Sequence, residues 1–224
     1  AMIAGYGFSG KTLAAQCAAL QIAAGLPIWS TRASDGYHAS GGYRVAGGPR
    51  RVLHLDYEMG QGATLRRYAK LARGLDLTAK DIADRLDIVC LPQVFLSDPT
   101  KLAGSETLAV EAFFAREVAA RPGEDPPVVI VDAFRGTVPG ADENDSNVRR
   151  YLDILTRVSE STHAVFVVLH HAGKADRADA RMMLRGSSAI FDACGSVLGI
   201  EGPADRADTA SPKLVTHLKS PEGR

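Results

Sequence analysis

The sequence has few of the features that mark secreted or membrane-spanning proteins. Its three cysteines, Cys17, Cys90 and Cys194, lie far apart and have neither disulfide nor metal-binding spacing, as is typical of a reduced compartment. The longest apolar run, residues 164–169, is far too short to cross a bilayer, and no signal peptide is recognisable. We therefore expect a cytoplasmic protein with no membrane partner.

The chain also lacks any excess of charge, because 26 lysines and arginines balance 26 aspartates and glutamates. A protein that coats DNA along its length is usually basic, so any nucleic-acid contact is expected to be local. With 224 residues, 46% of them hydrophobic, the chain suffices for one large α/β domain over residues 1–224. Residues 1–4 already have the pattern of a buried strand, so we expect a fragment whose N-terminal part is missing.

Short apolar runs alternate with amphipathic stretches, which predicts a mostly parallel, twisted sheet flanked by helices. The predicted strands are residues 1–4, 51–56, 87–91, 128–132, 164–169, 195–201 and 213–219. The predicted helices are residues 13–24, 60–73 and 105–120, and a fourth that begins at Asp145 or Ser146 and buries Val148, Leu152, Leu155 and Val158. Residues 28–50 and 172–186 are expected to be irregular; in the first, Trp29, Tyr37 and Tyr43 could stack on bases or simply pack.

The strongest motif is Gly5-Tyr-Gly-Phe-Ser-Gly-Lys-Thr12, which fits the phosphate-binding pattern G-x-x-x-x-G-K-[ST]. Glycines let such a loop fold back so that its N–H groups surround phosphate oxygens, and the following helix adds its positive end. The motif predicts an ATP site in which Lys11 reaches the β- and γ-phosphates and the Thr12 hydroxyl binds Mg²⁺. The nucleotide-binding residues are expected to be Gly7, Phe8, Ser9, Gly10, Lys11 and Thr12.

Two carboxylates at predicted strand ends complete the candidate site. Asp132 closes an apolar strand and is the expected partner of Thr12 at Mg²⁺. The residue after it is Ala133 and not the glutamate that many P-loop motors carry, so the base that activates water must lie elsewhere. Glu58 is the best candidate for this base. The alternative is that Glu58 only stabilises the start of a helix.

Missing motifs and shared ones together point to one family. There is no Asn-Lys-x-Asp motif, which disfavours GTPases, and no Leu-Ser-Gly-Gly signature, which disfavours transporter-type ATPases. The ordered segments GYGFSGKT, LDYEMG, VVIVDAF, VVLHHAGK and RGSSAIFDACG resemble the RecA-like P-loop ATPases. Within them, the chain is most similar to the plasmid RepA-type hexameric replicative helicases and their mobile-element AAA relatives, over roughly residues 1–200.

The resemblance implies roles for particular residues. Glu58 would be the general base, with Lys11 at the phosphates, and His171 would sense the γ-phosphate; the alternative for His171 is a histidine that bonds only strand-end backbone. Residues 172–186 would face a central channel and contact single-stranded DNA, unless they are only a solvated connection. The residues implied to contact DNA or the neighbouring subunit are Lys174, Arg177, Arg181, Arg185 and Lys219.

The sequence departs from the helicases where an arginine should act on the neighbouring subunit's ATP. That position is Gly195 here, and Lys219 is followed by Ser220 and Pro221 instead of by an arginine two residues on. Arg185 or Arg224 are the candidate substitutes. Three interpretations follow. The first is a ring-forming motor, hexameric as the resemblance implies, that acts on single-stranded DNA in the replication of a mobile element. The second is a switch that uses ATP to assemble with a protein partner, and the third is a degenerate ATP-binding module. The intact phosphate-site residues argue against the third.

Overall fold

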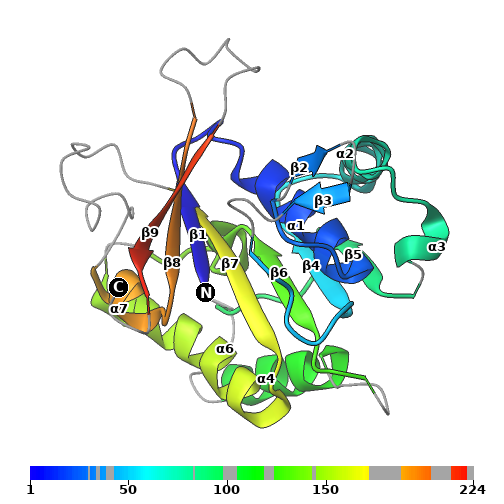
Figure 1. Cartoon of the computed structure of the whole chain (residues 1–224). Coiled ribbons are helices and arrows are strands. Elements are labelled where there is room, and N and C mark those ends of the chain that lie inside the picture. Colours follow the sequence, from blue (N-terminus) through cyan, green and yellow to red (C-terminus); the bar gives the residue numbers. More distant parts are fainter. Residues whose placement is uncertain are drawn as a thin grey trace.

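The structure is a computed structural model that describes residues 1–29, 31–33, 36–38, 43–82, 84–97, 105–118, 124–142, 145–171, 188–202 and 213–220. Its centre is a seven-stranded sheet of order β5-β4-β6-β7-β1-β8-β9 (Figure 1). The strands are β1 (Met2–Gly5), β4 (Val52–Asp56), β5 (Leu86–Cys90), β6 (Val128–Asp132), β7 (Val165–His171), β8 (Val197–Glu201) and β9 (Leu214–Lys219). Neighbouring strands are parallel except for the β8–β9 pair, so the predicted, mostly parallel sheet is confirmed.

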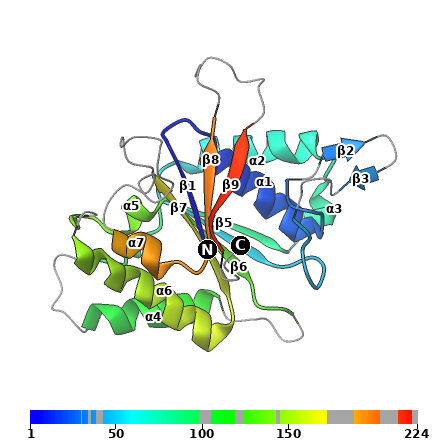
Figure 2. The same ribbon diagram turned by 60° about the vertical axis from the view of Figure 1, so that its left-hand side comes forward.

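Helices cover both faces of this sheet, as the alternating pattern predicts. One face carries α1 (Lys11–Ala24), α2 (Gln61–Gly74) and α3 (Ala79–Ile82). The other carries α4 (Ser105–Glu117), α6 (Arg149–Thr162) and α7 (Ser188–Ala193). Figure 2 shows the two groups on opposite sides of the strands. The fold is therefore three layers, with the sheet between two helical layers.

The strands alternate their side chains between two hydrophobic cores. In β1, Met2 and Ala4 pack into the core under α4 and α6, whereas Ile3 packs into the core under α1 and α2. All five residues of β6, Val128–Asp132, are buried, because helices cover it on both sides. This explains why its sequence is apolar up to the final aspartate.

The fourth predicted helix forms as expected. The Asp145 carboxylate accepts a hydrogen bond from the Asn147 N–H and caps a 3-10 turn, Ser146–Val148, that leads into α6. The predicted stripe is buried: Val148, Leu152, Leu155 and Val158 are each at most 5% exposed. The capping hydrogen bonds also keep the pKa of Asp145 below its ordinary value. A helix start is thus the role of Asp145.

Some elements were not expected from the sequence. Within residues 28–50, β2 (Thr31–Ala33) and β3 (Gly36–His38) form a separate antiparallel pair, and α5 (Phe134–Thr137) follows β6. Trp29 packs on α1, where its Nε1–H donates to the Ala14 carbonyl oxygen at 2.9 Å. Tyr43 stacks on His217 of β9, with ring centroids 5.6 Å apart. The Tyr37 side chain and residues 172–187 lie outside the described part of the chain.

The direction of the strands decides where a functional site can form. Because β1, β4, β6, β7 and β8 are parallel, their carboxyl ends meet at one edge of the sheet, which is where α/β proteins bind ligands. The loops that follow β1, β4, β6 and β7 carry the residues singled out from the sequence. Across the described residues, no helix is long and apolar enough to cross a membrane.

Candidate functional site

The loop from Gly5 to Thr12 joins the carboxyl end of β1 to the first turn of α1. Gly10 precedes the helix with φ 90°, a conformation that glycine adopts without strain, and no side chain caps the helix start. Phe8, also at positive φ, lies at the surface of the loop and is 90% exposed. The six predicted nucleotide-binding residues therefore belong to one bend at the N-terminus of a 14-residue helix, the geometry that favours a phosphate group.

Ser9 gives the interior of this bend an unused polar group. Its side chain is 4% exposed, and its Oγ has no hydrogen-bond partner among the residues the structure describes. A buried hydroxyl without a partner is costly. A ligand oxygen in the bend would supply the missing partner.

Lys11 places a positive charge in the centre of the loop. Its Nζ donates to the carbonyl oxygens of Gly5, at 2.8 Å, and Tyr6, at 2.9 Å, and the residue is only 6% exposed. Burial lowers the pKa of Lys11, while the negative charges of Glu58 and Asp132 act in the opposite direction. The lysine and the two predicted carboxylates are thus close enough to share one electrostatic environment.

Two aspartates pair across β4 and β6, and their surroundings distinguish them. Asp56, directly opposite Asp132 in the sheet, is fully buried, and its Oδ1 accepts hydrogen bonds from the N–H groups of Glu58 and Met59. Its Oδ2 accepts a hydrogen bond from the Thr64 hydroxyl. Asp56 is therefore occupied in shaping the loop that carries Glu58.

Asp132, by contrast, has an oxygen available for a ligand. It is 2% exposed, and its Oδ2 has no hydrogen-bond partner within the described residues. The Nε2 atom of His54 lies 3.8 Å from Asp132 Oδ2, which is too long for a hydrogen bond. A buried carboxylate oxygen without a partner beside Lys11 fits the oxygen chemistry that Mg²⁺ prefers.

Glu58 and His171 meet across the sheet edge, one after β4 and the other at the end of β7. His171 Nε2 lies 3.0 Å from Glu58 Oε1, and both side chains are about two-fifths exposed. Since a carboxylate can only accept, Nε2 carries the hydrogen. This hydrogen bond, together with the charges of His171 and Lys11, lowers the pKa of Glu58 despite its partial burial. Glu58 is accordingly an ionised base at neutral pH.

A buried histidine in β4 was not singled out from the sequence. His54 is fully buried, and its Nδ1 lies 2.9 Å from the Tyr68 hydroxyl of α2. The only signal in the sequence is a polar residue inside the apolar run RVLHLD. The other ring nitrogen of His54, Nε2, lies 3.8 Å from Asp132 Oδ2, so the pair packs beside the strand end that carries this carboxylate.

The remaining predicted residues lie elsewhere or outside the described residues. His170, the neighbour of His171 for which no role is predicted, is buried beside Phe134, with ring centroids 5.8 Å apart. Lys219 pairs with Val197 at the amino end of β8, and its Nζ donates to the carbonyl oxygens of Phe191 and Asp192. Lys219 is therefore far from its own phosphate loop, and its contact with a neighbouring subunit stays a prediction. Lys174, Arg177, Arg181 and Arg185 fall outside the described ranges.

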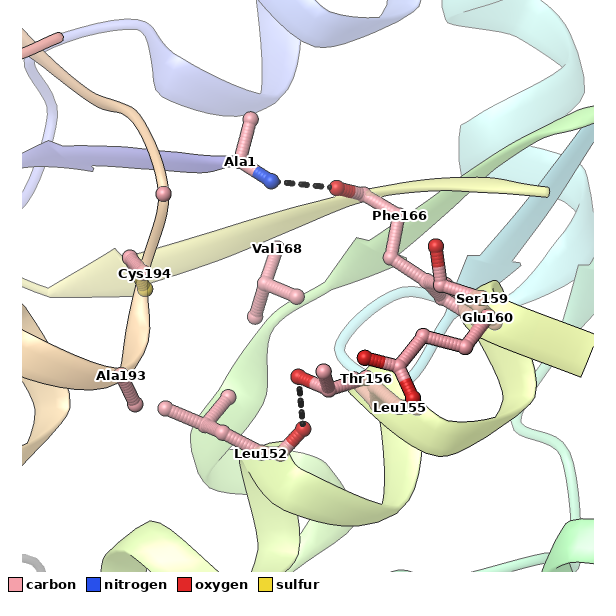
Figure 3. A pocket seen from close by; sticks show the side chains of 11 residues that line it. Ala1, Leu152, Leu155, Thr156, Ser159, Glu160, Phe166, Val168, Ala193 and Cys194 are labelled. Carbon is pink, nitrogen blue, oxygen red and sulfur yellow. Dashed lines mark hydrogen bonds between the residues drawn. The ribbon is translucent and has the colours of Figure 1, made fainter. Parts of the chain in front are cut away.

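A pocket of about 160 Å³ lies at the opposite edge of the sheet (Figure 3). It is lined by α6 residues, by Phe166 and Val168 of β7 and by Cys194, and the amino group of Ala1 lies at its edge, donating to the Phe166 carbonyl oxygen at 2.7 Å. The length of β1 separates this pocket from the phosphate loop. It takes no part in the candidate site.

Comparison with known proteins agrees with this geometry. Residues 1–177 match the family described as AAA domain. The structure is similar to that of a DnaB-like replicative helicase studied with its interactions with primase, with a TM-score of 0.63 at 15% sequence identity. That alignment covers 100% of this chain but 54% of the helicase chain, so this chain spans about half of the helicase's length. No curated protein has significant similarity to the sequence.

The fold, the phosphate loop and the family match support one assignment. The sheet with helices on both faces is the RecA-like architecture shared with that helicase structure. The family match covers more than half of the chain and includes the loop, both carboxylates and His171. The chain therefore belongs to the AAA domain family and has a RecA-like fold with a P-loop.

Proposed function

We propose that the chain binds Mg²⁺–ATP at the Gly5–Thr12 loop and uses the energy of hydrolysis as a helicase-like motor on single-stranded DNA. The observation that carries the proposal is the Glu58–His171 pair, held at 3.0 Å beside Lys11 and Asp132 at the carboxyl edge of the sheet. These side chains would supply a base, a cation and an available carboxylate around one position. Those are the parts that phosphoryl transfer to water requires.

The chemistry follows from the positions of these groups. Glu58 accepts a proton from a water molecule as that water attacks the γ-phosphorus, and the bond to the bridging oxygen breaks to release ADP and phosphate. Lys11 and the loop N–H groups offset the negative charge that develops on the phosphate oxygens. Asp132 and the Thr12 hydroxyl would hold Mg²⁺, which when bound neutralises part of the triphosphate charge.

His171 links this chemistry to the rest of the chain. It ends β7, and its hydrogen bond to Glu58 connects that strand end to the catalytic carboxylate. Any change at Glu58 on hydrolysis would alter this hydrogen bond and so reach the chain that follows, where the basic residues Lys174, Arg177, Arg181 and Arg185 occur. We therefore assign His171 as the residue that senses the γ-phosphate and transmits its loss.

The similarity to a replicative helicase supports the DNA-dependent part of the proposal. A hexameric ring of copies would bring Lys219 of one subunit near the ATP of the next and would multiply a modest positive charge around a central DNA strand. Replication of a mobile element is the setting proposed.

Two features favour a second candidate function, an ATP-dependent switch that assembles with a protein partner. The overall charge is balanced, with 26 basic and 26 acidic residues, and Gly195 stands in place of an arginine.

The test is the ATPase rate with and without single-stranded DNA at several salt concentrations. The motor predicts stimulation of several-fold that falls as salt rises, because phosphate contacts release counterions. Solution mass should increase with a non-hydrolysable ATP analogue. A rate that DNA leaves unchanged in every oligomeric preparation supports the switch. If the wild type hydrolyses ATP no faster than Glu58→Gln does, both candidate functions are contradicted.

A further inference from the structure

A second lysine lies across the phosphate loop of its own chain. Lys213 directly precedes β9, whose first residue, Leu214, pairs with Glu201 at the carboxyl end of β8. A Cβ built on Gly10 would lie 2.8 Å from Lys213 Cε and 3.0 Å from its Cδ, so the lysine arm rests against this glycine. The Nζ lies 3.7 Å from the Cβ positions of both Gly10 and Gly202. The ammonium group is therefore held beside the bend that receives phosphate.

The charge of Lys213 is not used within the part of the chain that the structure describes. Its side chain is exposed, and no hydrogen bond or ion pair joins it to a described residue. Lys11, by comparison, donates to two loop carbonyl oxygens, and Lys219 donates to two carbonyl oxygens at the other end of the sheet. Lys213 is thus a cation at the loop with its donors available.

Strand order decides which part of a nucleotide Lys213 would contact. Strand β1 lies between β7 and β8 (Figure 1). Glu58 and His171 follow strands on the β7 side of the loop, whereas Lys213 precedes β9, beyond β8 on the other side. If the γ-phosphate faces Glu58, the opposite end of the triphosphate points towards β8 and β9. Lys213 then lies nearest the phosphates that ATP and ADP share.

We propose that Lys213 is a second phosphate-binding cation, which acts on the nucleotide of its own chain and contacts the α- or β-phosphate. The inference rests on the proposed function, because it needs a nucleotide in the loop. It separates two tasks: Glu58 and His171 act on the terminal phosphate, whereas Lys213 sets the affinity for nucleoside di- and triphosphates alike. Gly10 permits this arrangement, because a side chain at that position would displace the aliphatic part of Lys213.

The experiment measures binding of fluorescent ATP and ADP analogues to the wild type and to Lys213→Ala, Lys213→Arg and Lys80→Ala. Lys80 is an exposed lysine on α3, on the far side of the molecule from β9 (Figure 1), and controls for the loss of one positive charge. Lys213→Ala should weaken both analogues by the same factor, about tenfold, as expected for a charged contact that is partly exposed to water. Lys213→Arg should retain most of the affinity, and Lys80→Ala should bind as the wild type does.

Each other outcome has a definite meaning. Wild-type affinity in Lys213→Ala overturns the inference, and so does a loss confined to ATP, since the lysine would then act at the γ-phosphate. If Lys213→Ala regains affinity when mixed with Lys11→Ala, the lysine is supplied by another subunit and action within one chain is wrong. If the wild type and Lys80→Ala bind neither analogue, the proposed function fails instead. Thermal unfolding of each variant checks that it is folded.

Discussion

Replacing Glu58 with glutamine tests the assignment of the base with almost no change in shape. The amide can still accept a hydrogen bond from His171 Nε2, which lies 3.0 Å from the carboxylate, but it cannot take a proton from water. A positioned general base contributes about 10²- to 10⁴-fold in rate, which corresponds to about 2.7–5.4 kcal/mol in the activation barrier. Turnover of Glu58→Gln should fall by that factor.

Stability and binding should change far less than turnover. Glu58 and His171 are about two-fifths exposed, and ion pairs at such positions contribute at most about 1 kcal/mol to the free energy of unfolding. The substitution also removes no atom that contacts Lys11, whose Nζ donates to the carbonyl oxygens of Gly5 and Tyr6. The variant should therefore bind a fluorescent ATP analogue with close to wild-type affinity while it hydrolyses ATP poorly.

The assay is phosphate release under saturating ATP, with analogue binding and thermal unfolding measured on the same preparations. Glu160→Gln is the matched control, because Glu160 is exposed on α6, far from the loop. An unchanged rate in Glu58→Gln would remove this residue from the mechanism. Loss of analogue binding along with the rate would show that Glu58 is needed to form the site and would refute its role as a base.

Three further substitutions probe other contacts. Lys11→Ala should weaken ATP-analogue binding, because a charge-assisted contact is worth about 1.5–3 kcal/mol, and retained tight binding would place the lysine elsewhere. His171→Ala should raise the pKa of Glu58 by removing the hydrogen bond that lowers it, so the acid limb of the pH–rate profile should move to higher pH; an unmoved limb would contradict the pair. Tyr68→Phe leaves the buried His54 Nδ1 without its partner at 2.9 Å and should cost about 1–3 kcal/mol in urea unfolding, whereas wild-type stability would show the contact to be dispensable.

Local pattern was enough to predict the sheet and the loop. Strand β6 is apolar at every position before Asp132, and strands buried on both faces have this composition because helices cover each side. The glycines and lysine of residues 5–12 are similarly constrained by the backbone that a phosphate loop requires. These features depend on residues adjacent in the chain, so the sequence alone displays them.

Contacts between distant segments could not be predicted in this way. His54 gains its partner only when α2 brings Tyr68 back over β4, and Lys213 reaches Gly10 only when β9 returns beside β8. Lys219 is predicted to reach the ATP of a neighbouring subunit, and its pairing with Val197 shows only that it lies at the amino end of β8, far from the phosphate loop of its own chain. Which end of a strand carries a residue depends on strand direction, and in the seven-stranded sheet of the described residues β9 is the strand that runs antiparallel to its neighbour.

The most direct test of the central claim is a crystal structure of the chain with a non-hydrolysable ATP analogue and Mg²⁺. The account predicts the β- and γ-phosphates inside the Gly5–Thr12 bend, with Lys11 Nζ on phosphate oxygens, the metal ion between Thr12 and Asp132, and Glu58 beside the γ-phosphate. An empty bend with the nucleotide bound elsewhere, or Asp132 and Glu58 directed away from the phosphates, would contradict it.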